Sequence, residues 1–184
     1  MRLGFAALLS LVVVAVPSVA HAQIEDYASY DAPKKCHAKP RAGTDYLGHW
    51  VARHFGGGYV GYGRPCDKKD GPTSEHQTGQ AFDWSLDASK KRDRRTAKDF
   101  LHRIFEKDAR GNTDAWARRM GIMYLIWDDE MYPAWNEFRP EPYLSSGCTS
   151  KKKCSKTLRH RNHVHVSLDM DGAKGRTSWF EDRL

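Results

Sequence analysis

Two short stretches of the sequence place side chains that could bind a metal ion at fixed spacings. In the stretch PTSEHQTGQAFDWS, residues 72–85, His76 precedes Asp83 by seven residues, and a glycine lies between them. Later in the chain, the stretch HVHVSL contains His163 and His165. Because side chains of a β-strand alternate between its two faces, these two imidazoles should project from the same face of a predicted strand.

The stretch AFDWSL has the same alternating design, with apolar side chains on one face and Asp83 on the other. If the two strands pair, Asp83 and His165 can lie opposite each other, with Cβ atoms about 4.5–5.5 Å apart. His76 can then turn back over the glycine-containing turn as a third ligand. Two imidazoles and one carboxylate, with a fourth position left for water, are the donors of a catalytic Zn²⁺ site. The sequence therefore predicts that His76, Asp83 and His165 bind zinc.

The same residues resemble the signature of a known family. The stretch SEHQTGQAFD, residues 74–83, is similar to the motif S-x-H-x-x-G-x-A-x-D of the LAS metallopeptidases. That group includes lysostaphin-type endopeptidases, D-Ala-D-Ala carboxypeptidases and dipeptidases, and the hedgehog fold. The stretch HVH, residues 163–165, is similar to their second motif, H-x-H. The stretches MYLIW and RHRNHVHVSL further resemble the D-Ala-D-Ala carboxypeptidase-like branch of small secreted proteins.

This resemblance implies a function and the same three zinc ligands, His76, Asp83 and His165. The expected protein is a zinc-dependent peptidase that hydrolyses amide bonds of peptidoglycan stem peptides with a metal-activated water. It would act as a D,D-carboxypeptidase or as an endopeptidase. The alternative is a non-catalytic, zinc-containing module of the same fold that binds cell-wall or protein ligands.

The chain departs from the family pattern at the position of the general base. Several relatives have a Glu three residues before the last zinc-binding histidine, where this chain has Asn162, which cannot take a proton. His163 is a candidate base because it projects from the same face as His165, although it could instead only orient a ligand. His160 is a second candidate, because H-x-x-H-x-H also resembles murein endopeptidases that lack the Glu. Asn162 itself favours the non-catalytic alternative.

Two further residues are candidates for supporting roles. Arg64, in the stretch GYGRP, lies in the segment where relatives have an arginine that stabilises the developing oxyanion. The alternative for Arg64 is an ordinary surface residue. We expect Ser74 to hydrogen-bond within the turn close to the metal ligands. It is not expected to act as a nucleophile, because no base stands beside it at the spacing of a serine protease.

The remaining sequence predicts an α+β fold in which a small antiparallel sheet holds the zinc site and helices pack on one face. A helix should have Thr44 or Asp45 as its N-cap, and a second, basic helix should follow Ser89 as its cap. A third helix is expected within residues 112–121. Strands are expected at residues 59–65, 81–87, 122–127 and 163–169. Residues 128–160 are poorly periodic, and their aromatic residues indicate an ordered wall.

Several aromatic and acidic residues could form the walls of a substrate cleft, and each also has a structural alternative. The aromatic side chains of Trp127, Tyr132 and Trp135 could form a substrate wall or pack under the long loop. The acidic run at residues 128–130 could receive a cationic group of a wall peptide or balance the excess of basic residues.

The four cysteines, Cys36, Cys66, Cys148 and Cys154, are an even set with no C-x-x-C pair. In an oxidising compartment such a set predicts two disulfides. Three pairings are possible, and we favour Cys36–Cys66 and Cys148–Cys154.

The ends and the charge of the chain complete the prediction. Residues 1–22 have the pattern of a cleaved signal peptide, residues 23–43 should be irregular, and residues 44–184 should form a single metallopeptidase-like domain. We expect a secreted or periplasmic monomer with no stable membrane anchor. The formal charge of +7 favours anionic wall polymers as partners of a basic surface. The sequence has no motif for reading nucleic acid.

Overall fold

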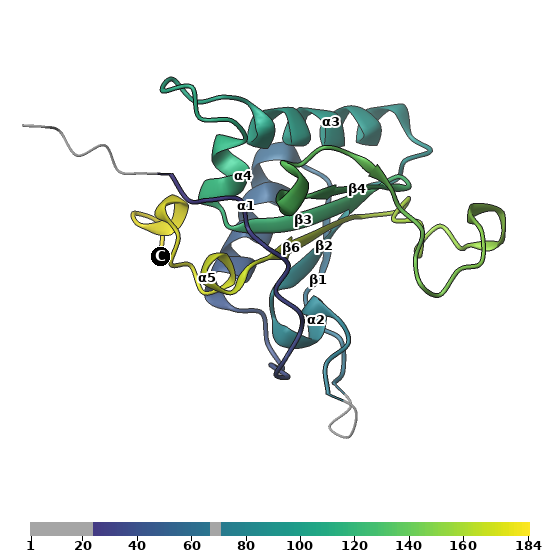
Figure 1. The fold of residues 1–184 in the computed structure, drawn as a ribbon. Helices are drawn as coiled ribbons and strands as arrows, with labels where there is room; N and C mark the ends of the chain where they lie inside the picture. Colours follow the sequence, from purple (N-terminus) through teal and green to yellow (C-terminus); the bar gives the residue numbers. More distant parts are fainter. Residues whose placement is uncertain (1–23, 67–70) are drawn as a thin grey trace, which may run out of the picture.

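A six-stranded antiparallel sheet with the strand order β1-β2-β6-β3-β4-β5 forms the centre of the computed structural model (Figure 1). The structure describes residues 24–66 and 71–184, so the predicted signal peptide lies outside the described residues. The strands are β1 (Gly58–Gly61), β2 (Ala81–Ser85), β3 (Ile122–Trp127), β4 (Glu130–Pro133), β5 (Glu141–Pro142) and β6 (Val164–Leu168). The helices are α1 (Ala42–Phe55), α2 (Glu75–Thr78), α3 (Lys91–Phe105), α4 (Ala115–Arg119) and α5 (Met170–Ala173). Three short 3₁₀ helices are η1 (Ala134–Asn136), η2 (Lys151–Lys153) and η3 (Ser178–Phe180). The predicted α+β class and antiparallel sheet are confirmed.

Strands β2 and β6 pair in the register that the two motifs predicted. Asp83 lies opposite His165, and Phe82 lies opposite Val166. Strand β3 pairs with the other edge of β6, so β6 and β3 are the two central strands. All six residues of β3 are buried, as expected for a central strand.

Helices α1, α3 and α4 cover the apolar face of the sheet (Figure 1). Phe82 and Trp84 from β2, and Val164 and Val166 from β6, are almost fully buried against them. Burial of one such side chain stabilises the fold by about 1.5–3 kcal/mol. The apolar face of the sheet therefore fixes which side chains are left to the opposite face.

Two helices begin at positions other than those predicted from their caps. Helix α1 begins at Ala42, with Arg41 and not Thr44 or Asp45 at its N-cap, and Gly43 in its first turn is within backbone contact of α5. A Cβ atom on Gly43 would lie 2.0 Å from the carbonyl oxygen of Gly172, so this close packing requires a glycine in the helix. Helix α3 begins after Lys90, because the hydroxyl of Ser89 donates to Asp87 instead of capping the helix.

An irregular N-terminal segment, residues 24–41, runs past the sheet toward α2 (Figure 1). Its backbone bonds to α2 and the turn after it, from His37 N–H to the Gln77 carbonyl at 2.8 Å and from Arg41 N–H to the Gly79 carbonyl at 3.0 Å. Ala28 packs against Met123 and its neighbours on β3. The predicted irregular segment is thus ordered by contacts, and it ends two residues earlier than predicted.

The two disulfides have the pairing that we favoured. Cys36–Cys66 joins the N-terminal segment to the loop after β1, and Cys148–Cys154 closes a short loop that contains η2. Such a bond typically stabilises a fold by about 2–4 kcal/mol. Among the described residues, helices are too short or too polar to cross a membrane.

We predict that Gly79→Ala destabilises the protein by about 2 kcal/mol or more. Gly79 has φ +73°, and a Cβ atom there would lie 2.5 Å from the carbonyl oxygen of Lys39. Urea unfolding measures the loss. Gly61→Ala is the control, because a Cβ atom at Gly61 would have no neighbour within 4 Å, and its effect should stay within about 0.5 kcal/mol. Equal unfolding midpoints for the two variants would contradict the described packing of the N-terminal segment on α2.

Candidate metal centre

Three side chains from three different elements meet on the polar face of the sheet. His76 Nε2 of α2 lies 3.2 Å from Asp83 Oδ1 of β2 and 3.1 Å from His165 Nδ1 of β6. The third distance, from His165 Nδ1 to Asp83 Oδ1, is 3.0 Å. The structure therefore brings together all three residues predicted to bind a metal ion.

The local sequence explains this convergence. The register of β2 and β6 places Asp83 beside His165. Gly79, in the left-handed conformation at the end of α2, turns the chain from the helix into β2, so that His76 lies over the strand. Ser74 occupies the N-cap position of α2. Its side chain makes no capping bond, and its carbonyl accepts the Gln77 N–H at 2.9 Å, so the backbone closes the turn.

Each of the two imidazoles makes a hydrogen bond through the nitrogen that points away from the cluster. For His76, this bond shows which nitrogen has the hydrogen. His76 Nδ1 lies 2.9 Å from the carbonyl oxygen of Tyr62, which can only accept, so Nδ1 has the hydrogen and Nε2 presents a lone pair. His165 Nε2 lies 2.8 Å from the Ser167 hydroxyl. His76 Nε2 and the Asp83 carboxylate are thus two acceptors 3.2 Å apart, with no hydrogen of their own to share. A bound cation would satisfy them, so the donor set fits a metal ion.

The protonation states also suit a metal ligand set. Burial disfavours the charge of Asp83, but its close contacts with His165 and His76 outweigh this effect and hold the pKa of Asp83 well below its usual range. Burial lowers the pKa of His165, and Asp83 only partly offsets this effect. At neutral pH the cluster therefore offers a carboxylate and an uncharged imidazole, the forms that bind metal ions. Two nitrogens and one oxygen suit zinc and several other transition metals.

A further imidazole, that of His163, adjoins the cluster. His163 Nε2 lies 3.5 Å from Asp83 Oδ1, and its other nitrogen, Nδ1, lies 2.9 Å from Asn162 Oδ1. The Asn162 amide nitrogen donates to Thr157 Oγ1 at 3.0 Å, which turns its carbonyl oxygen toward His163. Nδ1 of His163 therefore donates to Asn162, and Nε2 presents a lone pair toward the cluster. Asn162, the residue that departs from the family pattern, orients this imidazole.

His160 lies behind His163. Its ring centroid is 4.7 Å from that of His163 and 5.6 Å from that of His165. Burial and the neighbouring imidazoles His165 and His163 lower the pKa of His160 to about 3. Nδ1 of His160 is buried and has no hydrogen-bond partner among the described residues. His160 is thus an uncharged wall of the site, one ring further from Asp83 than His163.

Arg64 lies on the same side of the molecule as the cluster. Its side chain is exposed, and its positive charge contributes to the lowered pKa of His163 after the larger effects of burial and of nearby charged groups. The same charge acts on Tyr143, whose ring lies 5.1 Å from that of His160. Arg64 is therefore an exposed cation near the rim of the site.

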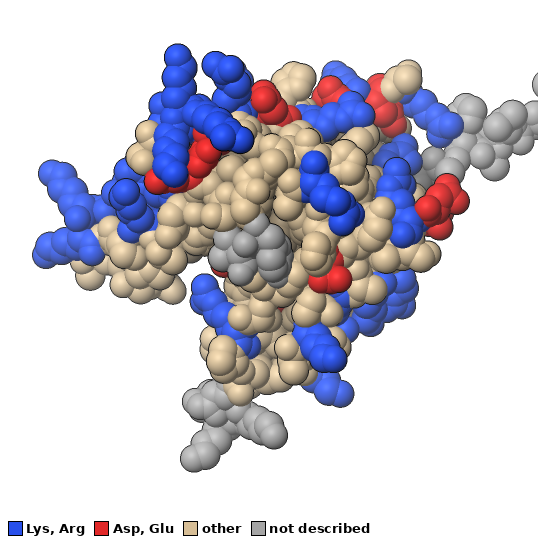
Figure 2. Space-filling model, turned by 180° about the vertical axis from the view of Figure 1, so that it is seen from behind, with Lys and Arg blue, Asp and Glu red and all other residues tan. Residues whose placement is uncertain are grey.

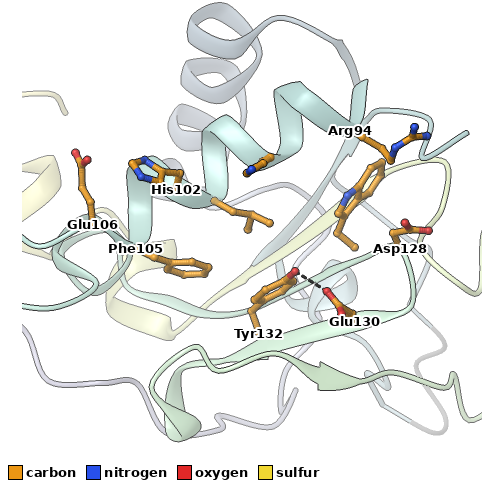
Figure 3. A pocket seen from close by; sticks show the side chains of 10 residues that line it. Arg94, His102, Phe105, Glu106, Asp128, Glu130 and Tyr132 are labelled. Carbon is orange, nitrogen blue, oxygen red and sulfur yellow. Dashed lines mark hydrogen bonds between the residues drawn. The ribbon is translucent and has the colours of Figure 1, made fainter. Parts of the chain in front are cut away.

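The proposed substrate walls divide between the two faces of the sheet. Trp135 contacts Tyr124 at 6.1 Å, and Tyr124 stacks on His165 at 5.5 Å, so this tryptophan is on the polar face. Trp127 and Tyr132 instead line a groove of about 660 Å³ between α3 and the β3–β4 hairpin (Figure 3). Trp127 and Tyr132 therefore do not lie beside the metal ligands, because alternation along the hairpin points them to the helix-covered face.

The acidic run at residues 128–130 is accounted for by local partners. Arg161 pairs with Asp128 at 2.8 Å, and Arg159 makes a bidentate pair with Asp129 at 2.6–2.8 Å. Glu130 accepts from the Tyr132 hydroxyl at 2.8 Å in the groove (Figure 3). These pairs support the alternative in which the acidic run balances basic residues.

The sequence motifs did not indicate three residues behind the cluster, which are Glu75, Tyr124 and Tyr62. Tyr62 holds His76 through a backbone carbonyl, which no side-chain pattern could reveal. Glu75 is buried and accepts from the Tyr124 hydroxyl at 2.8 Å. One feature of the sequence could have indicated hydrogen bonds behind the cluster: Ser167 lies on the same strand face as His165.

Comparison with known proteins places part of this architecture in a family. Residues 36–151 match the family described as VldE, C-terminal domain. The matched range includes His76 and Asp83 and ends before β6, which contains His165. No curated protein and no solved structure matches the chain. Because the match spans more than half of its residues, the chain belongs to the VldE C-terminal domain family.

Proposed function

We propose that the protein is an exported zinc-dependent peptidase that hydrolyses amide bonds in peptidoglycan stem peptides. The main support is the cluster of His76, Asp83 and His165, whose facing atoms lie 3.0–3.2 Å apart. The similarity of the two motifs to LAS metallopeptidases supplies the substrate class. The two disulfides suit an oxidising compartment, in line with export.

His76, Asp83 and His165 would hold the zinc ion, which when bound lowers the pKa of a water molecule and polarises the scissile carbonyl. His163 supplies the proton acceptor. Its Nε2 lone pair faces the cluster, and burial, the largest effect on its pKa, lowers that pKa and keeps the ring uncharged at neutral pH. Asn162 holds the ring in this orientation. Arg64 at the rim would stabilise negative charge that develops on the substrate oxygen.

We predict that zinc stabilises the purified protein against heat and that chelation reverses the effect. Zinc at 100 times its Kd adds about 2.7 kcal/mol to the free energy of unfolding. His165→Ala should abolish the stabilisation, because it removes one of three ligands. His102→Ala is the matched control, since His102 is exposed on α3 and lies away from the cluster. A wild-type melting temperature that does not respond to zinc, together with no metal in elemental analysis, would refute the metal centre.

We predict that the zinc-loaded protein releases fragments from purified sacculi, and that mass spectrometry of the digested muropeptides identifies the bond from the mass lost. His163→Ala should lower kcat by about 10²–10⁴ without loss of zinc, because it removes the proton acceptor. Asn162→Ala should lower kcat by about 10–100-fold, whereas Asn162→Asp, which keeps an acceptor for His163 Nδ1, should lose less. Zinc binding without any fragment, and with His163→Ala indistinguishable from wild type, would instead support the non-catalytic wall-binding alternative.

A basic surface supports a role beside an anionic wall. Figure 2 shows Lys and Arg side chains gathered along the side on which α3 lies. The start of α3 and the segment after η2 come together there, because Ala88 N–H donates to the Arg161 carbonyl at 2.8 Å. Hydrogen bonds from Ser89 lower the pKa of Asp87, and the charges of Lys156 and Lys90 contribute to the same shift. We define the basic end by its exposed residues Lys90, Lys91, Arg92, Arg95, Lys152, Lys153 and Lys156.

We predict that the protein binds purified wall teichoic acid through the basic end and that added salt weakens this binding steeply, because bound cations are released from the polymer. The triple variant Lys90→Gln, Lys91→Gln, Lys156→Gln should bind at least about tenfold more weakly, since each lost charge removes one phosphate contact. The control Arg53→Gln, Lys174→Gln removes exposed charges from α1 and from the end of α5. Equal loss per charge removed in the two variants would show that net charge alone, and not the basic end, determines binding.

A further inference from the structure

A buried carboxylate lies directly behind the candidate metal centre. Glu75 precedes His76 in α2 and is 5% exposed. Its Oε2 accepts from the Tyr124 hydroxyl at 2.8 Å, and Tyr30 hydrogen-bonds to the same carboxyl group, which contributes after burial to the raised pKa of Tyr30. None of the ion pairs between described residues involves Glu75. A buried carboxylate without a positive partner is costly, so its place beside the cluster calls for a reason.

Hydrogen bonds connect this carboxylate to His165. Tyr124 lies opposite Ser167 in the pairing of β3 with β6. The Tyr124 hydroxyl gives its single hydrogen to Glu75, so its oxygen can only accept from Ser167, whose hydrogen bond partly offsets the rise that burial causes in the pKa of Tyr124. The Ser167 hydroxyl, having donated to Tyr124, accepts from His165 Nε2 at 2.8 Å. All the donors therefore point from His165 toward Glu75.

This direction settles the tautomer of His165. A serine hydroxyl can donate or accept, so Ser167 alone does not decide which nitrogen of His165 has the hydrogen. With Glu75 at the far end, the hydrogen must be on Nε2, and Nδ1 presents its lone pair to Asp83 and His76. Tyr124 also stacks on the His165 ring, with centroids 5.5 Å apart, and so fixes the plane of the imidazole.

The charges around a bound divalent ion also indicate a role for Glu75. A divalent ion bound by two neutral imidazoles and the Asp83 carboxylate keeps one net positive charge. The Glu75 carboxylate, connected through Tyr124 and Ser167, balances that charge. Without the ion, the same carboxylate is a buried and uncompensated charge.

We infer that Glu75 is a positioning residue of the metal centre, which orients His165 through Tyr124 and Ser167 and balances the charge of a bound divalent ion. The inference rests on the proposed metal centre and not on peptidase activity. The charge of Glu75 should lower the stability of the metal-free protein and raise the stability of the zinc-loaded protein.

The test is Glu75→Gln, which keeps the side-chain length and an acceptor for Tyr124 but removes the charge. Zinc affinity is measured by competition with a chromophoric chelator, and urea unfolding is measured for the metal-free and the zinc-loaded protein. We expect the Kd for zinc to rise about 10–100-fold. The unfolding midpoint should stay equal or rise in the metal-free protein and fall in the zinc-loaded protein.

Two further variants sharpen the test. Tyr124→Phe interrupts the same chain of hydrogen bonds, and the double variant with Glu75→Gln should weaken zinc binding no more than the stronger single variant does. Glu181→Gln is the matched control, because Glu181 is exposed at the end of η3, and it should change neither affinity nor stability.

The outcomes separate the inference from the proposed function. An unchanged Kd, with equal loss of stability in the metal-free and zinc-loaded proteins, would show that Glu75 only holds α2 in place and would overturn the inference. A wild-type protein that binds no zinc would overturn both the metal centre and the inference. Tight zinc binding weakened by Glu75→Gln, in a protein that cuts no peptide, would support the inference and reject the peptidase.

Discussion

The pairing of β2 with β6 is the interaction on which the rest of the structure depends. It places Asp83 opposite His165 on one face of the sheet and Phe82 opposite Val166 on the other. A shift of the register by one residue would move the carboxylate into the helix-covered core and an apolar side chain into the candidate metal centre. Because the buried apolar pairs oppose such a shift, the energy that folds the domain also holds two of the three candidate ligands in place.

The third candidate ligand depends on a different part of the chain. His76 belongs to a short helix that is not in the sheet, and isolated helices of this length are not stable in water. Backbone bonds from His37 and Arg41 hold the helix and the turn after it, and the Cys36–Cys66 disulfide ties that N-terminal segment to the loop after β1. The disulfide and the irregular segment are therefore part of what positions His76.

The sequence could predict the features that depend on neighbouring residues, but not those that depend on contacts between distant segments. Alternation along a strand is local, so β2, β3 and β6 and the meeting of Asp83 with His165 were predictable. The start of α1 was not, because it depends on the close approach of Gly43 to Gly172 in α5. The face of the β3–β4 hairpin that holds Tyr132, and the partner of Glu75, depend on packing between segments distant in sequence.

The balance of charge around a bound divalent ion explains why position 162 can have an uncharged amide. In the proposed metal centre, Asp83 and Glu75 already supply two negative charges against a divalent ion, so a glutamate at position 162 would add a third. Asn162 gives His163 an acceptor without adding charge, and its hydrogen bond leaves Nε2 free on the side of the cluster. The neutral residue at 162 and the buried carboxylate at 75 are thus consistent with one arrangement, in which the proton acceptor is the imidazole of His163, directly before β6, and the balancing charge lies behind His165.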